Sequence, residues 1–392
     1  MKKSDCNNVF KVKLNIEIPE FLFYVAFAFY SFAIGIVYIN YNIRYTSLIK
    51  NLVYFFQIIA LFFLMLKIII QKKRLATLPI LILLCLIGLL SWFKSGENYF
   101  FWLVIFIACG YAVKLRKVAI ISLYTTLTII VFSFISLNLG TAYDASFIGQ
   151  NSQLRHSLGF IHPNTFARYI LMLCIPFSIL YYKSKTLVVY FMLVFSGLIC
   201  YRISGSRTSL ILVAVQLFLV FLYSTITNHK IRKKILAILT FACISCIIMS
   251  YYFMLSFDDS NPVHHVLNQI FSERLSLAHL YYKHDAVTLF GHEYVSDLSA
   301  NMPASYLVDN SYCHLVLREG IIPTTFLLIM IIYLLIKINK NLSWNAFSLG
   351  FFIILLFSFT ETVGIMVETN YFLLILASFF FQKTNRRPQS EI

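Results

Sequence analysis

The feature that most constrains this chain is a series of long apolar runs, each separated from the next by a short polar break. Of its 392 residues, 60% are hydrophobic and only 12% are charged, whereas soluble domains contain about 45–50% apolar and about 25% charged residues. A surface this apolar would not dissolve in water. Because each membrane crossing needs about 20 apolar residues, the sequence predicts an all-α polytopic membrane protein of about 12 transmembrane helices, one domain over residues 1–392.

Twelve candidate spans can be placed from the apolar runs. The fourth and the last of them are short for a membrane crossing. The spans lie near residues 21–39, 48–70, 75–93, 99–113, 118–139, 165–182, 187–201, 208–226, 235–255, 311–336, 344–365 and 371–381.

Basic residues are distributed unevenly between the two sets of connecting loops. If the N-terminus is cytoplasmic, 22 of the 32 lysines and arginines fall in cytoplasmic segments, and every cytoplasmic loop contains some of them. An excess of Lys and Arg in cytoplasmic loops is the usual orientation signal of membrane proteins. The sequence therefore predicts that both termini are cytoplasmic, and the net charge of +16 reflects contact with membrane lipids and predicts no nucleic-acid partner.

Arginine dominates the basic residues on the predicted outer side, where it accounts for seven of ten, against five of 22 inside. Guanidinium groups bind phosphate or carboxylate through two parallel hydrogen bonds, which favours an anion-binding role for them. The alternative is that they only extend from helix ends towards water. The ten outer residues are Arg44, Lys50, Lys94, Arg155, Arg168, Arg202, Arg207, Arg274, Lys283 and Arg318.

Residues 140–164 form the first of two long outer loops, and long loops often carry function. This loop ends in His162-Pro163-Asn164, directly before a span, so that Asn164 or Thr165 is expected to cap the helix. The motif fits either a polar site at the mouth of the bundle or a capping device alone. Arg168 follows within the same helix, and a cation placed there usually faces a polar cavity.

A short outer turn over residues 202–209 carries two arginines, Arg202 and Arg207, among serine and threonine hydroxyls around Gly205. Free N–H groups and hydroxyls at the start of the following helix suit a bound anion. Capping by Ser206 or Thr208 explains the hydroxyls but not both arginines.

Residues 257–310 form the second long outer loop. Within it, residues 272–289 place apolar side chains three and four residues apart, which predicts an amphipathic helix on the membrane surface. The alternative is a helix that packs on the protein as a lid. The apolar stripe consists of Leu275, Ala278, Tyr282, Ala286 and Leu289.

The second loop ends in Asp309-Asn310-Ser311-Tyr312. A carboxylate at this boundary could act as a general base, or it could cap the next helix. His314, Arg318 and Glu319 follow in that helix, and Glu361 lies near the outer end of a later span. We expect Glu361 to pair with one of the outer arginines.

The sequence contains no phosphate-binding loop, no dinucleotide-binding fingerprint and no spaced set of metal ligands. An outer-face reaction must therefore draw its energy from the substrate, and a sugar linked through pyrophosphate to a polyisoprenoid meets this need. Cleavage of that bond leaves negative charge on the pyrophosphate, which arginines can stabilise. The candidate pyrophosphate-binding residues are Arg155, Arg168, Arg202, Arg207, Arg274 and Arg318. The candidate bases are Asp309 first, then His162 and His292.

In four segments the chain resembles the O-antigen polymerase and ligase family, and the Wzy-type capsule polymerases in particular. The segments are 159–168 with its His-Pro-Asn, 204–210 with Ser-Gly-Ser-Arg-Thr-Ser-Leu, 272–291, and 309–320, and together they cover most of residues 150–325. Ligases of this family have a histidine before the corresponding Asn-x-Tyr, where this chain has Asp309. That difference favours polymerase over ligase and leaves the identity of the base open.

The resemblance implies a membrane glycosyltransferase of GT-C-like fold in a bacterial plasma membrane, without a metal or another cofactor. Its substrates would be undecaprenyl-pyrophosphate-linked oligosaccharides, as donor and acceptor, polymerised into a capsule, exopolysaccharide or O-antigen. A flippase and a chain-length regulator would be its partners. The alternatives are a ligase that transfers the glycan to another acceptor and a lipid-linked oligosaccharide flippase. A transporter usually has polar, broken helices near the midplane in repeated halves, and no such repeat is visible here.

Overall fold

The computed structural model describes residues 17–71, 78–148, 154–284, 287–293 and 308–380 of the chain. The two ends, whose cytoplasmic location is predicted, lie outside these residues, as do residues 149–153 of the first long loop and 285–286 and 294–307 of the second. The regular structure in the described residues is helical apart from two isolated β-bridges and one short antiparallel hairpin, in which Phe147 pairs with Arg155 and Ile148 with Leu154.

The elements follow one another in this order: α1 Ile18–Val37, α2 Ile43–Ile70, α3 Leu78–Ser95, α4 Tyr99–Cys109, α5 Leu115–Asn138, β1 Phe147–Ile148, β2 Leu154–Arg155, α6 Pro163–Tyr181, α7 Thr186–Ile199, η1 Cys200–Ser204, α8 Arg207–Thr225, α9 His229–Ser256, α10 Pro262–Ile270, α11 Arg274–His284, α13 Ser311–His314, η2 Leu315–Glu319, α14 Ile321–Lys340, α15 Ala346–Phe357, η3 Tyr371–Leu376 and α16 Ala377–Phe380.

Eight helices in the described residues are long and apolar enough to cross a membrane. They are α1, α2, α5, α6, α7 with its extension η1, α8, α9 and α14, and the shorter apolar helices are the α3 segment Pro79–Ser95, α4 and α15. The all-α, multi-pass character predicted from the apolar runs agrees with this architecture.

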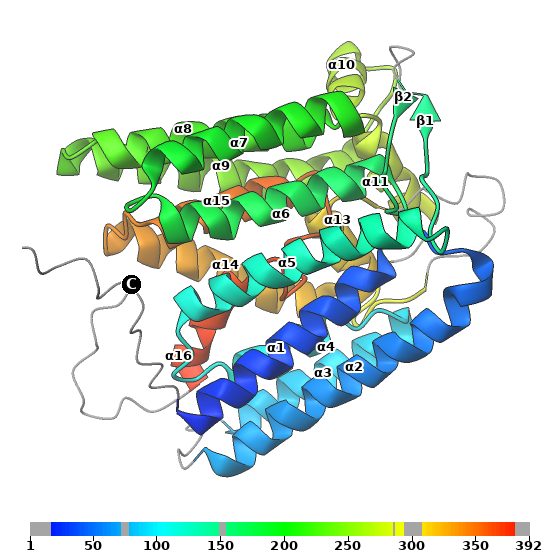
Figure 1. The fold of residues 1–392 in the computed structure, drawn as a ribbon. Helices are drawn as coiled ribbons and strands as arrows, with labels where there is room; N and C mark the ends of the chain where they lie inside the picture. The colour runs from blue at the N-terminus through cyan, green and yellow to red at the C-terminus, as the bar shows by residue number, and fades with distance from the viewer. Residues whose placement is uncertain (1–16, 72–77, 149–153, 285–286, 294–307, 381–392) are drawn as a thin grey trace, which may run out of the picture.

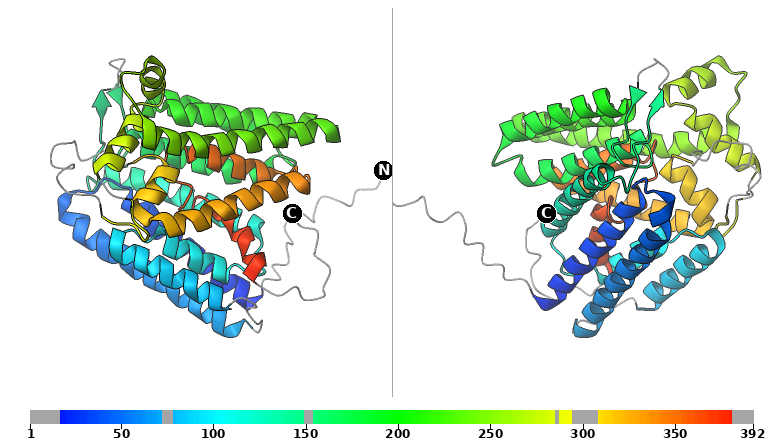
Figure 2. Two further views of the ribbon diagram at one scale, coloured as in Figure 1. Left: turned by 180° about the vertical axis from the view of Figure 1, so that it is seen from behind. Right: turned by 45° about the vertical axis from the view of Figure 1, so that its right-hand side comes forward.

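The long helices run side by side as one bundle (Figure 1). The N-terminal helices, blue to cyan, form one side of it, α7 to α9 in green form the opposite side, and the C-terminal segments lie between them (Figure 2). Both long loops meet at one end, which we call the long-loop end; there the hairpin β1–β2 joins the turn after α7 through a hydrogen bond from His156 N to Ile203 O (2.9 Å).

Asparagine side chains begin many of the helices. Asn228, for example, accepts hydrogen bonds from the backbone N–H groups of Lys230 and Ile231 at the start of α9. Helix starts leave N–H groups without intrahelical partners, and a short polar side chain satisfies them. The asparagine-capped helices are α2, α9, α10, α13 and α15.

The last three predicted spans differ from the structure. The segment predicted as one helix over 311–336 is interrupted at Gly320, whose φ of 97° leaves the helical region. Helix α15 ends at Phe357 rather than continuing to residue 365, and 371–381 begins as the six-residue 3₁₀ turn η3. Polar residues stand beside both breaks, since Arg318 and Glu319 precede Gly320 and Ser358 follows Phe357. Mean apolar composition over a span-length window passes over them.

The amphipathic helix predicted over 272–289 is shorter and faces another partner. Helix α11 covers only Arg274–His284, and Ala286 of the predicted stripe lies outside the described residues. Leu275, Ala278 and Tyr281 are buried, and the last two pack with Met254 of α9. Of the predicted stripe, Leu275 and Ala278 are buried and Tyr282 is partly buried, whereas Leu289, beyond the end of α11, is 57% exposed. Helix α11 itself packs on the protein, as in the alternative interpretation.

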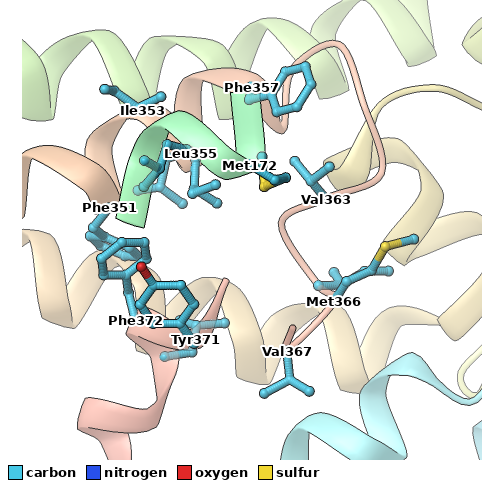
Figure 3. Close-up of a cluster of buried hydrophobic side chains, with 14 of the residues drawn as sticks. Met172, Phe351, Ile353, Leu355, Phe357, Val363, Met366, Val367, Tyr371 and Phe372 are labelled. Atoms are coloured by element: carbon cyan, nitrogen blue, oxygen red, sulfur yellow. The ribbon is translucent and has the colours of Figure 1, made fainter. Parts of the chain in front are cut away.

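The core between the two sides of the bundle is built largely by α15 and the segment that follows it. Phe351, Leu355 and Phe357 of α15 pack near Val363 and Tyr371 (Figure 3). Polar contacts lock the same region, because Ser311 Oγ donates to Glu361 O (2.6 Å) and accepts from Gly364 N (2.9 Å). These contacts hold residues 358–364 against α13 at the long-loop end.

Candidate functional site

Arg274, the first residue of α11, lies between two carboxylates at the long-loop end. Its Nη2 is 3.0 Å from Glu361 Oε1 and 3.5 Å from Asp309 Oδ2. Its side chain is only 10% exposed. The expected pairing of Glu361 with an outer arginine is therefore confirmed. Both carboxylates contact Nη2 of Arg274. Neither of these two ion pairs involves its Nη1 or Nε atom.

Asp309 lies directly before α13 but does not cap it. The cap is Asn310, whose side chain accepts hydrogen bonds from Tyr312 N (2.9 Å) and Cys313 N (3.2 Å). The pKa of the Asp309 carboxyl is raised above its ordinary value, because loss of solvent outweighs the opposing charges of Arg274 and Arg168. A carboxylate with a raised pKa is a stronger base, which suits the general-base role predicted for Asp309.

Arg155, on strand β2, ties the two helix starts at this end together. Its Nε donates to Ser204 O (2.6 Å) and its Nη2 to Asn164 Oδ1 (2.5 Å). The pKa of Arg155 is lowered by burial and then by the positive charges of Arg207 and Arg274. The charges of the exposed Arg207 and of Arg274 therefore each act on Arg155, and such a concentration of positive charge favours a bound anion.

The turn that carries these contacts has an unusual backbone. Residues Cys200–Ser204 form a single π-helical turn, and Gly205 follows with a φ of 59°. A Cβ at Gly205 would lie 3.0 Å from both Cγ and Nε of Arg155. Glycine is thus required here for its left-handed backbone and for the close approach of Arg155. Single π-helical turns occur often at functional sites.

His162 caps α6, in place of the predicted Asn164 or Thr165. Its Nδ1 accepts a hydrogen bond from Asn164 N (3.1 Å), and its ring centroid is 4.8 Å from that of Phe147. Burial, followed by the charges of Arg155 and Arg274, lowers the pKa of His162 to about 4. The neutral ring with an occupied Nδ1 carries its proton on Nε2, so it can donate a hydrogen bond to a substrate but cannot accept a proton there.

The fold of the first long loop depends on Asp144. Its Oδ1 accepts hydrogen bonds from Ser157 N (2.8 Å) and Leu158 N (2.9 Å), and its Oδ2 lies 2.6 Å from His156 Nδ1. Burial raises the pKa of Asp144, but the hydrogen bonds from His156, Leu158 and Ser157 outweigh it and lower the pKa below the ordinary value. This carboxylate holds the loop that presents Arg155 to the site.

Arg168 is buried one turn into α6 and lines a cavity beside the site. Its guanidinium carbon is 4.2 Å from the ring centroid of Tyr38, and its charge also acts on Asp309. The cavity has a volume of about 30 Å³, and Glu368 and Thr126 line it as well. This is room for one or two water molecules. The expectation that Arg168 faces a polar cavity is confirmed.

Three predicted site residues lie in other surroundings. Arg318, in the π-helical turn η2, pairs with Glu97 (Nη2 to Oε1, 3.1 Å), and the neighbouring Glu319 is buried and accepts hydrogen bonds from Ser91 Oγ and Phe100 N. His292 follows Gly291, which packs against the backbone of Arg318. Arg202 is exposed, with its guanidinium carbon 5.9 Å from the Tyr201 ring centroid.

The structure therefore brings together Arg155, His162, Arg207, Arg274 and Asp309, with Arg168 alongside. Sequence reasoning missed Asn164 as the partner of Arg155 and Glu97 as the partner of Arg318. It also treated Glu361 only as a pairing partner, although Glu361 shares Arg274 with Asp309. Nothing in the spacing of these residues indicated such pairings, because 87 residues separate Arg274 from Glu361.

Comparisons with protein-family models, with curated proteins and with solved structures find no match to this chain.

Proposed function

We propose that this chain polymerises oligosaccharide repeat units linked through pyrophosphate to undecaprenol, on the outer face of a bacterial plasma membrane. The observation that carries the proposal is the cluster of Arg155, Arg207 and Arg274 beside the Asp309 carboxyl at one end of an apolar helix bundle. Cations gathered at one end of the bundle can hold a diphosphate, and the surrounding apolar helices suit its polyisoprenoid tail.

The reaction would use these groups as follows. A hydroxyl oxygen of the acceptor sugar attacks the anomeric carbon of the donor, and the bond from that carbon to the pyrophosphate oxygen breaks. The electron pair of the broken bond stays on the pyrophosphate, where the arginines stabilise the developing charge. The hydroxyl proton passes to Asp309, and His162 Nε2–H offers a hydrogen bond to a sugar or phosphate oxygen.

The ion-paired charges Arg274, Asp309 and Glu361 lie at the long-loop end, which favours a glycosyltransferase over a flippase. In this proposal the twelve predicted crossings would consist of the eight long helices, the three shorter apolar helices and the segment of η3 and α16. The termini would then lie in the cytoplasm and the long-loop end outside, with a flippase and a chain-length regulator as partners in the pathway.

The test is to incubate the purified protein in liposomes with a lipid-pyrophosphate-linked repeat unit and to resolve the products by size. We expect a ladder of multiples of the unit. Transfer to a different acceptor would replace the proposal with a ligase, and movement across the membrane without a new glycosidic bond would replace it with a flippase.

Two arginine variants locate the activity in the cluster. Arg207→Ala and Arg274→Ala should each abolish chain growth, because each removes a charge that faces the leaving diphosphate. Arg207 is exposed, so Arg207→Ala should leave the amount of protein in the membrane unchanged. Arg274→Ala leaves two carboxylates without their cation, so its chain growth is normalised to the amount of folded protein. Loss of a single group that stabilises developing charge typically slows such a reaction about 10²–10³-fold. The measurement is the size ladder described above.

Arg116→Ala is the matched control, since Arg116 is an exposed arginine of α5 at the opposite end of the bundle. It should leave the ladder unchanged. Product of wild-type length from both Arg207→Ala and Arg274→Ala would refute the anion-binding assignment.

A further inference from the structure

Helix α10 exposes its apolar side and buries its polar side. Val263, Val266 and Ile270 are 63%, 55% and 61% exposed, whereas His264 and Asn268 are each only 7% exposed. The three apolar residues are spaced three and four apart, so they share one side of the helix. His265 and Gln269 are exposed on a further side and hydrogen-bond to each other (2.9 Å). The apolar side has no partner in the described chain.

Helix α10 lies beside an exposed apolar surface of α9. Helix α9 is one of the eight candidate membrane spans, and it exposes Ile248, Tyr252 and Leu255 by 62%, 52% and 53%. Tyr252 Oη lies 3.5 Å from His264 Nε2. The base of α10 therefore rests on the same side of α9 that exposes Tyr252, and Figure 1 shows α10 at the edge of the molecule at the long-loop end.

We infer that α10 lies in the membrane–water interface at the long-loop end, with Val263, Val266 and Ile270 inserted among the lipids. Amphipathic helices settle at this depth with their polar residues towards water, and tyrosines such as Tyr252 are enriched there. Only five residues, 257–261, separate α10 from the end of α9, so the helix cannot move far from the bilayer surface.

A lipid surface fits this face better than a second protein does. A stable protein interface buries about 800 Å² on each partner, and three aliphatic side chains on a nine-residue helix form only a narrow strip. The strip also lies beside the exposed apolar surface of a candidate membrane span. Both observations favour the lipid bilayer as the partner of the apolar side of α10.

The interfacial helix is connected to Arg274 through a short, well-bonded turn. The Asn268 side chain accepts from Ser276 N (3.0 Å) and donates to Ser276 Oγ (2.9 Å), and Asn268 O accepts from Glu273 N (2.8 Å). Ser272 and Glu273 both have positive φ, 55° and 65°. Such a strained turn persists only when surrounding contacts hold it. The depth of α10 in the interface thereby sets the depth of Arg274.

The inference can be tested with tryptophans placed on two sides of α10 in the full-length protein. Val263→Trp places the probe on the apolar side, and His265→Trp is the matched control two residues away on the polar side. Both variants are reconstituted in lipid nanodiscs whose acyl chains carry bromine near the headgroup. The emission of the three native tryptophans is subtracted by use of the unsubstituted protein.

The added emission of Val263→Trp should be shifted to shorter wavelength and quenched several-fold more strongly than that of His265→Trp. Val266→Trp should behave like Val263→Trp, which provides a second reading if the first variant fails to fold. Equal quenching on the two sides would overturn the inference. A blue-shifted probe on the apolar side that bromine fails to quench would also overturn it, because a protein would then cover the face.

Discussion

At the scale of single residues, the site separates groups that hold charge from groups that can transfer a proton. Arg274 is shared by two carboxylates, and Arg155 is fixed by a backbone oxygen and an amide oxygen. The Nδ1 atom of His162 accepts the hydrogen bond that caps α6. Asp309 has the raised pKa of a usable base. The preference for Asp309 over His162 as the base stays a prediction, and the hydrogen bond at His162 Nδ1 is a feature that the sequence does not show.

Asp309→Asn should slow polymerisation about 10²–10⁴-fold, the usual contribution of a general base. A base acts in its deprotonated form, so the wild-type rate should fall as pH drops through the pKa of Asp309. Because that pKa is raised, the fall should begin at a higher pH than the ordinary carboxyl value of about 4. The measurement is the initial rate of ladder formation as a function of pH.

Asp259→Asn is the control, since Asp259 belongs to the same loop and its side chain is 75% exposed. Its rate and pH profile should match the wild type. If Asp309→Asn kept the wild-type profile, the base would have to be another group, with Glu361 the nearest carboxylate on Arg274.

At the scale of elements, two π-helical turns lie next to arginines near the long-loop end. The turn η1 precedes Gly205 and Arg207, and η2 carries Arg318 and ends at Gly320. A π-helical turn widens the helix and leaves backbone groups to bond elsewhere, as Ser204 O does with Arg155. Apolar periodicity predicted helices here but not these local departures.

Two glycine variants separate backbone strain from the contact with Arg155. Gly205→Ala and Gly140→Ala each place a side chain at positive φ, 59° and 67°, which costs about 1–2 kcal/mol. We expect both to lower the thermal unfolding midpoint by a similar amount. Only Gly205→Ala should also reduce chain growth, because its Cβ meets Arg155 whereas that of Gly140 meets nothing within 4 Å.

The readouts are unfolding of the purified protein in detergent and the product ladder in liposomes. Equal loss of chain growth in both variants would mean that the strain, and not the placement of Arg155, controls activity.

At the scale of the whole molecule, the bundle is polarised along its axis. The long-loop end carries the arginine cluster and the hairpin, and the opposite end carries lysine-rich turns such as that between α6 and α7. This polarity, together with the positive-inside rule, predicts which end faces the cytoplasm.

Labelling of single introduced cysteines tests this orientation. Ser260→Cys, in the exposed turn before α10, should react with a membrane-impermeant maleimide added to intact cells, and Ser184→Cys, between α6 and α7, should react only after the cells are opened. Both serines are exposed, so accessibility within the protein is matched. The reverse pattern would place Arg274 in the cytosol and end the proposed mechanism. The unsubstituted protein corrects for its native cysteines.

By itself, the sequence determined the helical class, the positions of most spans and the identity of the polar segments that meet at the long-loop end. These follow from local properties, namely the length of each apolar run and the charge of each break. It did not determine the breaks at Gly320 and Phe357, since the few polar residues beside each break could also be accommodated in a longer span, and the course of each segment depends on what it packs against. Nor did it determine which side of which helix meets lipid.

The tertiary structure alone decided which charges meet. In the fold, Glu361 pairs with Arg274, and Arg318 pairs with Glu97. The buried side of α11 packs on α9, whereas the apolar side of α10 is exposed. The physical reason is that a buried charge needs an oppositely charged or hydrogen-bonding partner, and an apolar stripe needs other apolar groups to pack against. The local sequence leaves several possible partners for each buried charge and each apolar stripe. Only the packing of distant segments selects one of them.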